Sequence, residues 1–460
     1  MKKDENIVYS NKKTNISALW RIAYPLMLAT LSGNLMLFVD KVLISRFDAL
    51  AMAAVAAIGM IFTVFQVGTA SIVSIAEVFV GRFNGSQEYH KTGPVVWQMI
   101  WFSLFTMVVF FPIGMFCGKL FLPLEYHVFG VPYFKSIMLF GPVFTLIAAL
   151  SSFYIGLGKV KLVTFSTILA NFINIILDVI LIFGVEPYVS PMGTLGAAIA
   201  TGISISLQAL LLFIFFLQKK YRIFNQTAQF QFSFDLFIKC LKIGIPNSLG
   251  YFAEMTAWAI LLQLMAYHSH EHIIVLASGQ AIFLLLTFTT DGLQKSIIAL
   301  TSNIIGSRSL ELLPKLIKSA IKLHFILVVC FAIPAVFFPE QIIEFFISDN
   351  EDSINKEILL RYANITCLLV LFYFVFDGLV WIFAGILIAF EDTKFVMIMN
   401  SLSVWLLAIL PIYVAVDLLN YDANIIWECM IVYAFINALG FYLRYRNSFI
   451  NAKIVPNLVK

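Results

Sequence analysis

The feature that most restricts this chain is a series of about twelve apolar segments, each long enough to cross a lipid bilayer. Backbone N–H and C=O groups find no water inside a bilayer, so repeated spans of this length must be helical. The sequence therefore predicts an all-α polytopic membrane protein. The predicted spans are 17–45, 49–80, 93–122, 131–157, 162–184, 195–218, 236–267, 272–305, 316–338, 358–389, 394–418 and 424–446.

Composition agrees with this class, because 61% of the residues are hydrophobic and only 12% are charged. Soluble domains contain about 25% charged residues. The basic residues lie in short loops and form no continuous stripe, so we expect no nucleic-acid partner. The expected partners are the lipid bilayer and a small solute.

The distribution of Lys and Arg predicts the orientation. If the N-terminus is cytoplasmic, 23 of the 30 basic residues fall on the inner side. The outer loops collect acids instead, such as Asp349, Glu351 and Asp352. The first fifteen residues are polar and show no cleavable signal peptide. We therefore expect an integral protein of a bacterial-type inner membrane with both termini in the cytoplasm.

A faint repeat divides the chain into halves. Arg21-Ile-Ala-Tyr-Pro25 recurs as Lys242-Ile-Gly-Ile-Pro246 at the inner start of the first span of each half. The sequence thus predicts two pseudo-symmetric six-helix lobes around a central cleft. The predicted domains are a cytoplasmic tail (1–16), an N-lobe (17–218), a cytoplasmic linker (219–235), a C-lobe (236–446) and a second cytoplasmic tail (447–460).

Ionisable residues inside spans are the main functional signal. Asn174 and Asp178 are one helical turn apart in the fifth span and share a face. A carboxylate inside a span costs about 2.5–3.5 kcal/mol on insertion scales, so it is expected to face a cavity or a partner. At 1.5 Å per residue, Asp40, Asp178 and Thr201 all fall roughly 8–10 Å below the outer surface.

This set of oxygens is compatible with two kinds of coupling ion. Asp40, Asn174, Asp178 and Thr201, with a backbone carbonyl one turn away near Ala197, could enclose Na⁺. The same two carboxyl groups, desolvated and close together, could instead hold a proton. Asp40 has the alternative of reaching the outer interface beside Lys41.

The second half carries different charges. Glu254 and Asp377 lie at mid-depth with no partner in their own helix, which predicts a cavity lining that attracts a cationic substrate or a coupling ion. Asp291 and Lys295 are four residues apart in the eighth span. This spacing favours a structural ion pair over a proton relay.

Several of these segments resemble one known family. Its members, the multidrug and toxic compound extrusion transporters, typically show a proline, then Val-Asp, then Ala-Leu-Ala-Ala near the N-terminus. They also carry an Asn-x-x-Leu-Asp motif in the fifth helix. The matching segments here are Pro25-Leu-Met, Phe38-Val-Asp40, Ala49-Leu-Ala-Met-Ala-Ala-Val55, Asn174-Ile-Ile-Leu-Asp178 and Gly196-Ala-Ala-Ile-Ala-Thr201.

The resemblance implies cation-coupled antiport of organic, often cationic, amphiphiles by alternating access. It implies that the N-lobe cation site comprises Asp40, Asn174, Asp178, Ala197 and Thr201, and that Glu254 and Asp377 bind cation or substrate in the C-lobe. Asp291 with Lys295 is not a motif of the family, which leaves the substrate open.

Two alternative functions agree less well with these residues. A flippase for lipid-linked sugars, or a polysaccharide exporter of the same superfamily, would need basic cavity residues to hold phosphate, and Lys295 stands alone. An intramembrane enzyme is disfavoured because no Ser/His or His-Glu pattern lies in a span. We expect a monomer that is not an enzyme, with no cofactor and no metal other than Na⁺.

Overall fold

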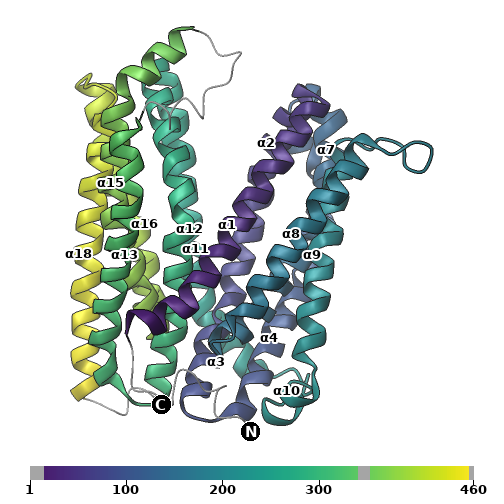
Figure 1. The fold of residues 1–460 in the computed structure, drawn as a ribbon, viewed down its shortest axis with the longest axis vertical. Helices are drawn as coiled ribbons and strands as arrows, with labels where there is room; N and C mark the ends of the chain where they lie inside the picture. Colours follow the sequence, from purple (N-terminus) through teal and green to yellow (C-terminus); the bar gives the residue numbers. More distant parts are fainter. Residues whose placement is uncertain (1–14, 340–352, 455–460) are drawn as a thin grey trace. The chain divides into compact units, whose positions relative to one another are not determined.

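The computed structural model describes residues 15–339 and 353–454, and within them the regular structure is helical (Figure 1). The first half contains α1 (Ile16–Phe47), α2 (Ala49–Ser74), α3 (Ala76–Gly85), α4 (Thr92–Phe105), α5 (Met107–Phe116), α6 (Gly118–Phe121), α7 (His127–Gly156), α8 (Val160–Phe183), α9 (Thr194–Phe216) and α10 (Lys219–Phe224). The second half contains α11 (Phe234–His268), α12 (His270–Gly306), α13 (Leu313–Phe337), α15 (Ser353–Ala389), α16 (Thr393–Ser403), α17 (Leu410–Tyr413) and α18 (Ile425–Ile454), with π-helical turns η4 (Val404–Ile409) and η5 (Val414–Leu418) around α17.

Twelve helical segments in these described ranges are long and apolar enough to span a bilayer, which confirms the predicted all-α polytopic class. Their bounds lie close to the predicted ones at most ends; the first, for example, runs over Ile16–Phe47. Many large apolar side chains are exposed along these helices, as lipid-facing residues must be. The described residues do not include three of the predicted outer acids, Asp349, Glu351 and Asp352. They also do not include the outermost parts of both predicted tails.

Two spans are interrupted where the sequence predicted continuous helices. The second span breaks at Ile75, one residue after the Ser74 hydroxyl donates to the Ser71 carbonyl at 2.9 Å. The third breaks at Thr106, whose hydroxyl donates to the Ser103 carbonyl at 2.6 Å. Hydroxyls that bond back to the preceding turn compete with the helix ladder and bend helices.

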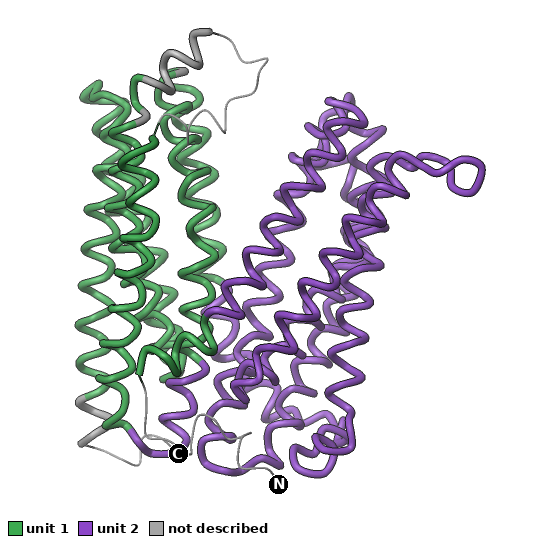
Figure 2. Tube along the Cα trace, in the orientation of Figure 1, with its two compact units in different colours: residues 1–23, 249–298, 310–460 green, residues 24–248, 299–309 purple. Residues whose placement is uncertain are grey.

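The chain forms two compact units (Figure 2). Unit 2 contains Tyr24–Ser248 and Ala299–Ser309, and unit 1 contains the residues up to Ala23, Leu249–Ile298 and the residues from Leu310 onward. The boundaries between the units therefore fall inside α1, α11 and α12. The predicted lobes 17–218 and 236–446, divided at the linker, remain a prediction.

Within unit 2, the segment that precedes α11 is anchored to α4. The Trp97 indole donates to the Thr227 carbonyl at 2.8 Å. The Gln98 amide donates to the Gln231 carbonyl at 3.0 Å and accepts from the Ser233 N–H at 2.9 Å. Because both ends of the buried Gln98 amide are bonded, this stretch of the predicted linker is fixed to α4 through its backbone.

In unit 1, the core contains Trp427 from α18, which is fully buried. Its indole N–H donates to the Val275 carbonyl of α12 at 3.4 Å, and its ring covers Gly279 one turn further along. A Cβ atom at Gly279 would lie 2.4 Å from the indole ring. The close approach of α12 and α18 therefore requires glycine at this position.

We predict that Gly279→Ala lowers the stability of the protein by about 1–3 kcal/mol, because a fully buried indole has no room to move aside. The measurement is thermal unfolding of the purified protein in detergent. The matched control is Gly59→Ala, a mid-helix site where a new Cβ would meet nothing within 4 Å. The control should be neutral or slightly stabilising, since Ala is the better helix former. Equal melting temperatures for the two variants would contradict this packing.

Candidate functional site

The first candidate site lies inside unit 2, where α8 packs along α9. Asn174 and Asp178 of α8 are fully buried. The Asn174 side-chain amide donates to the Thr201 hydroxyl at 3.4 Å, and that hydroxyl donates to the Ala197 carbonyl at 3.0 Å. The structure therefore brings together the four predicted residues of the fifth and sixth spans.

Asp40 of α1 completes this group. Its carboxyl group lies within hydrogen-bonding range of the Asp178 carboxyl group. Two carboxylates offer only acceptor oxygens, so neither can satisfy the other until a proton or a cation lies between them.

The oxygen atoms of this group have no donors. Asp40 Oδ1, Asn174 Oδ1 and both carboxylate oxygens of Asp178 are buried, and no donor from residues 15–339 or 353–454 reaches them with hydrogen-bond geometry. Burying one such polar atom without a partner costs about 1–3 kcal/mol. These four oxygens accept no hydrogen bond and lie in one group. They can therefore act as ligands for a proton or a small hard cation, so these residues fit the implied coupling ion.

The position of Asp40 is set by two hydrogen bonds between α1 and α8. The Thr164 hydroxyl donates to the Pro25 carbonyl at 2.7 Å, and the Asn171 amide donates to the Ser32 hydroxyl at 2.8 Å. Both pairs are separated by 139 residues in the sequence. The two helices thus run parallel in constant register. Continuing this register by about two turns brings Asp40 opposite Asp178.

Two participants were missed by the sequence analysis. Ser32 is the partner of Asn171. Tyr133 of α7 is half-buried, packs against the apolar cluster that contains Ala197, and lies near both Asp40 and Asp178. The only signal for either residue is a hydroxyl inside a span. Periodicity within one helix does not say which face of a neighbouring helix it meets.

The second candidate site lies inside unit 1. Asp377 of α15 is only 6% exposed, and its Oδ2 atom has no hydrogen-bond partner among the described residues. Tyr373 and Trp381, one turn before and after it, have donors beside its carboxyl group. Glu254 of α11 is half-buried and close enough for its charge to act on Asp377. The structure therefore brings the two predicted C-lobe acids into one electrostatic group.

Asp291 of α12 belongs to the same group, because its charge acts on both Glu254 and Asp377. Lys295, one turn further along α12, is exposed. No N–O distance of 4 Å or less joins Asp291 and Lys295 in the described part of the chain, and their ion pair remains a prediction. Tyr433 of α18, which the sequence analysis missed, lies near Glu254 and Asp377.

The polar residues near the α11–α12 turn have structural partners. The His272 ring bonds to the Ser269 hydroxyl at 2.7 Å and to the Tyr421 carbonyl at 3.1 Å. Asp422, which lies outside the spans, accepts from the Tyr362 hydroxyl at 2.6 Å, and this bond lowers the pKa of Asp422. These contacts fix the connection to α18.

Comparison with known proteins identifies a family model and relatives that match this chain. The family model MatE matches residues 25–180 and 246–414, which include Asp40, Asp178, Glu254 and Asp377. A probable multidrug resistance protein NorM of Photorhabdus laumondii subsp. laumondii is 25% identical over 440 residues, 92% of this chain and 93% of the relative. A probable NorM of Bacillus subtilis is 26% identical over 59% of this chain and 61% of the relative.

A solved structure shows the same fold. The crystal structure of a MATE protein in complex with MaL6 superposes with a TM-score of 0.87 at 17% identity, covering 98% of this chain and 100% of that chain. The two-lobed helical architecture expected from the sequence is thus confirmed. Since the family model covers most of the chain and the relatives are transporters, the chain belongs to the multidrug and toxic compound extrusion (MatE) family of membrane transporters.

Proposed function

We propose that this transporter is an antiporter that exchanges H⁺ or Na⁺ for organic, cationic amphiphiles and works by alternating access. The observation that carries the proposal is the Asp40–Asp178 pair, whose buried oxygens accept no hydrogen bond in the part of the chain that the structure describes. The names of the NorM relatives support export of multiple compounds.

Electrostatics explains why this pair would hold a coupling ion. Two unit charges about 4 Å apart repel by roughly 4 kcal/mol at an effective dielectric constant near 20. The pair is therefore more stable with one positive charge between its carboxyl groups. H⁺ and Na⁺ both meet this need, and Asn174 Oδ1 adds a neutral ligand for Na⁺.

The α1–α8 contacts suggest how ion binding reaches the rest of unit 2. The two helices are joined at Pro25 and Ser32, away from the two carboxyl groups. Release of the ion leaves two like charges, and these charges lie only at the end of α1 that carries Asp40. Repulsion would then displace that end of α1, and binding of an ion would draw it back toward α8.

The acids of unit 1 are proposed to receive the cationic substrate or a second coupling ion. Glu254 and Asp377 lie in one electrostatic group with Asp291. A substrate that carries phosphate would be repelled there, so the flippase alternative gains no support from these charges. We also propose a monomer in a bacterial inner membrane, with both termini in the cytoplasm.

We predict that Asp178→Asn abolishes gradient-driven export, because the amide removes the charge that a coupling ion must neutralise. The measurement is efflux of a fluorescent cation from proteoliposomes, with a Na⁺ gradient and a pH gradient imposed separately. In the wild type, one of the two gradients should raise the rate of efflux at least roughly tenfold above the rate measured without a gradient.

The matched control is Glu186→Gln, an exposed carboxylate in the turn that follows α8. It should leave both efflux and melting temperature unchanged. Substrate binding and melting temperature should also persist in Asp178→Asn, which separates lost coupling from lost folding. Wild-type, gradient-dependent efflux by Asp178→Asn would refute the coupling role.

A second prediction concerns unit 1. The double variant Glu254→Gln/Asp377→Asn should weaken binding of a monovalent organic cation by roughly tenfold or more, because two negative charges leave a poorly solvated site. The measurement is equilibrium binding to purified protein. A neutral substrate analogue serves as the control, and its affinity should change little. Unaltered cation binding would remove Glu254 and Asp377 from the substrate site.

A further inference from the structure

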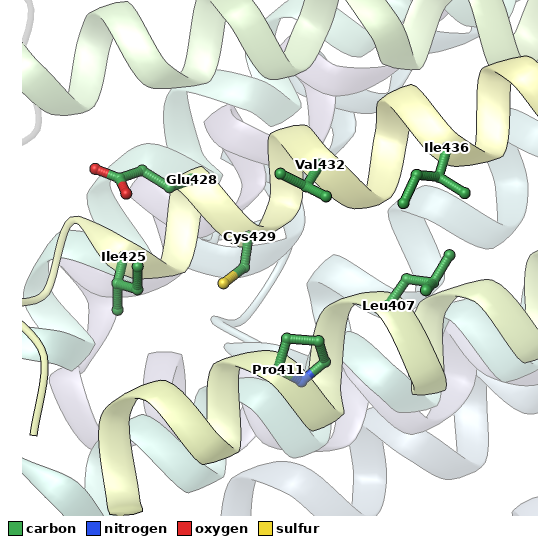
Figure 3. A pocket seen from close by; sticks show the side chains of 7 residues that line it. All are labelled: Leu407, Pro411, Ile425, Glu428, Cys429, Val432 and Ile436. Carbon is green, nitrogen blue, oxygen red and sulfur yellow. The ribbon is translucent and has the colours of Figure 1, made fainter. Parts of the chain in front are cut away.

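A groove on the surface of unit 1 lies apart from the acids described above. One side is formed by α18, where Ile425, Glu428, Cys429, Val432 and Ile436 share a helical face (Figure 3). The other side is formed by Leu407 and Pro411, and the cavity volume is about 280 Å³. The opposite face of α18 packs into the core through Trp427 and Met430. The groove is therefore on the outside of the helix packing.

The backbone explains why the two segments leave a groove. The π-helical turns η4 and η5 flank α17, and π turns widen the helix locally. Pro411 cannot donate a backbone hydrogen bond to Leu407, the residue one turn before it. Figure 3 shows Cys429 directed toward the segment that carries Pro411. The irregular backbone keeps Leu407 and Pro411 from closing against α18.

Glu428 gives the groove its chemistry. It lies in the first turn of α18, inside the span Ile425–Phe449, and is exposed. Its carboxylate makes no hydrogen bond or ion pair within the described ranges, and no basic side chain lines the groove. A lone carboxylate at the edge of a bilayer attracts a cation more strongly than it would in water, because the surroundings screen it poorly.

We propose that this groove binds a lipophilic monocation from the bilayer, with an alkyl chain along Leu407, Val432 and Ile436 and an ammonium group on Glu428. The apolar residues accept a hydrocarbon chain, and Glu428 is the one charged side chain among the described residues that line the groove. The volume lies just below the roughly 300 Å³ at which ligand pockets usually begin, so a single chain fits better than a fused ring system.

A phospholipid is a poorer occupant. Its phosphate needs basic or N–H donors. The described residues that line the groove include no Lys, Arg or His, and Pro411 has no backbone N–H that could donate to a phosphate. Apolar chains gain little by leaving lipid for an apolar groove, so the selectivity must come from the charge on Glu428.

The test is photo-crosslinking in phosphatidylcholine nanodiscs. The probe is a decyltrimethylammonium that carries a diazirine on its chain, with a decanol diazirine as its neutral counterpart. Mass spectrometry of peptides locates the label. We expect residues 425–436 to be labelled by the cation roughly fivefold or more above the neutral probe. Glu428→Gln should remove that excess, and Val432→Trp, which fills the groove, should reduce labelling by both probes.

The control variant is Glu125→Gln, an exposed carboxylate in the first turn of another span, which should label as the wild type does. Equal labelling by the two probes, or an excess that survives in Glu428→Gln, would overturn the proposal. A phosphatidylethanolamine diazirine that labels the same peptide and depends on Glu428 would overturn it too, in favour of a phospholipid. The readout is binding, so the result is independent of whether the antiport mechanism is correct.

Discussion

The arrangement of unit 2 depends on how two carboxyl groups are held together inside an apolar bundle. Asp40 and Asp178 would separate if α1 and α8 were free to do so. The hydrogen bonds Thr164–Pro25 and Asn171–Ser32 hold the two helices in parallel register below them. The pairs follow at intervals of about two helical turns, so each meets on the same face. The register, and not any attraction between the acids, places them in contact.

The two acid groups differ in what surrounds them, and this difference suggests different roles. Neither oxygen of Asp178 accepts a hydrogen bond within the described ranges, so its charge is tolerated only with a cation or proton bound. Asp377 has donors from Tyr373 and Trp381 beside it. These donors lie beside a carboxyl group that also feels the charges of Glu254 and Asp291. The first environment suits an ion that must always be exchanged, and the second suits a substrate that comes and goes.

Much of this could be predicted from the sequence, because hydropathy and helical rise depend on the backbone alone. These two quantities predicted the spans and placed Asp40, Asp178 and Thr201 at a common depth. They say nothing of how neighbouring helices are rotated, so Ser32, Tyr133 and Tyr433 were missed. The breaks at Ile75 and Thr106 and the π turns around Pro411 were missed as well, since Ser, Thr and Pro also occur inside continuous helices such as α1, α7 and α11.

Asp178 and Glu428 are both carboxylates in membrane spans, but they differ in the kind of ligand that each can bind. Both are acids in apolar helices, and neither forms an ion pair with a basic side chain of the described structure. Asp178 is sealed among helices, so its ligand must be small enough to reach a buried site. Glu428 is exposed at the end of an apolar groove, so its ligand can be long and can carry its charge at one end. Burial, rather than the residue type, decides which cation each carboxylate can accept.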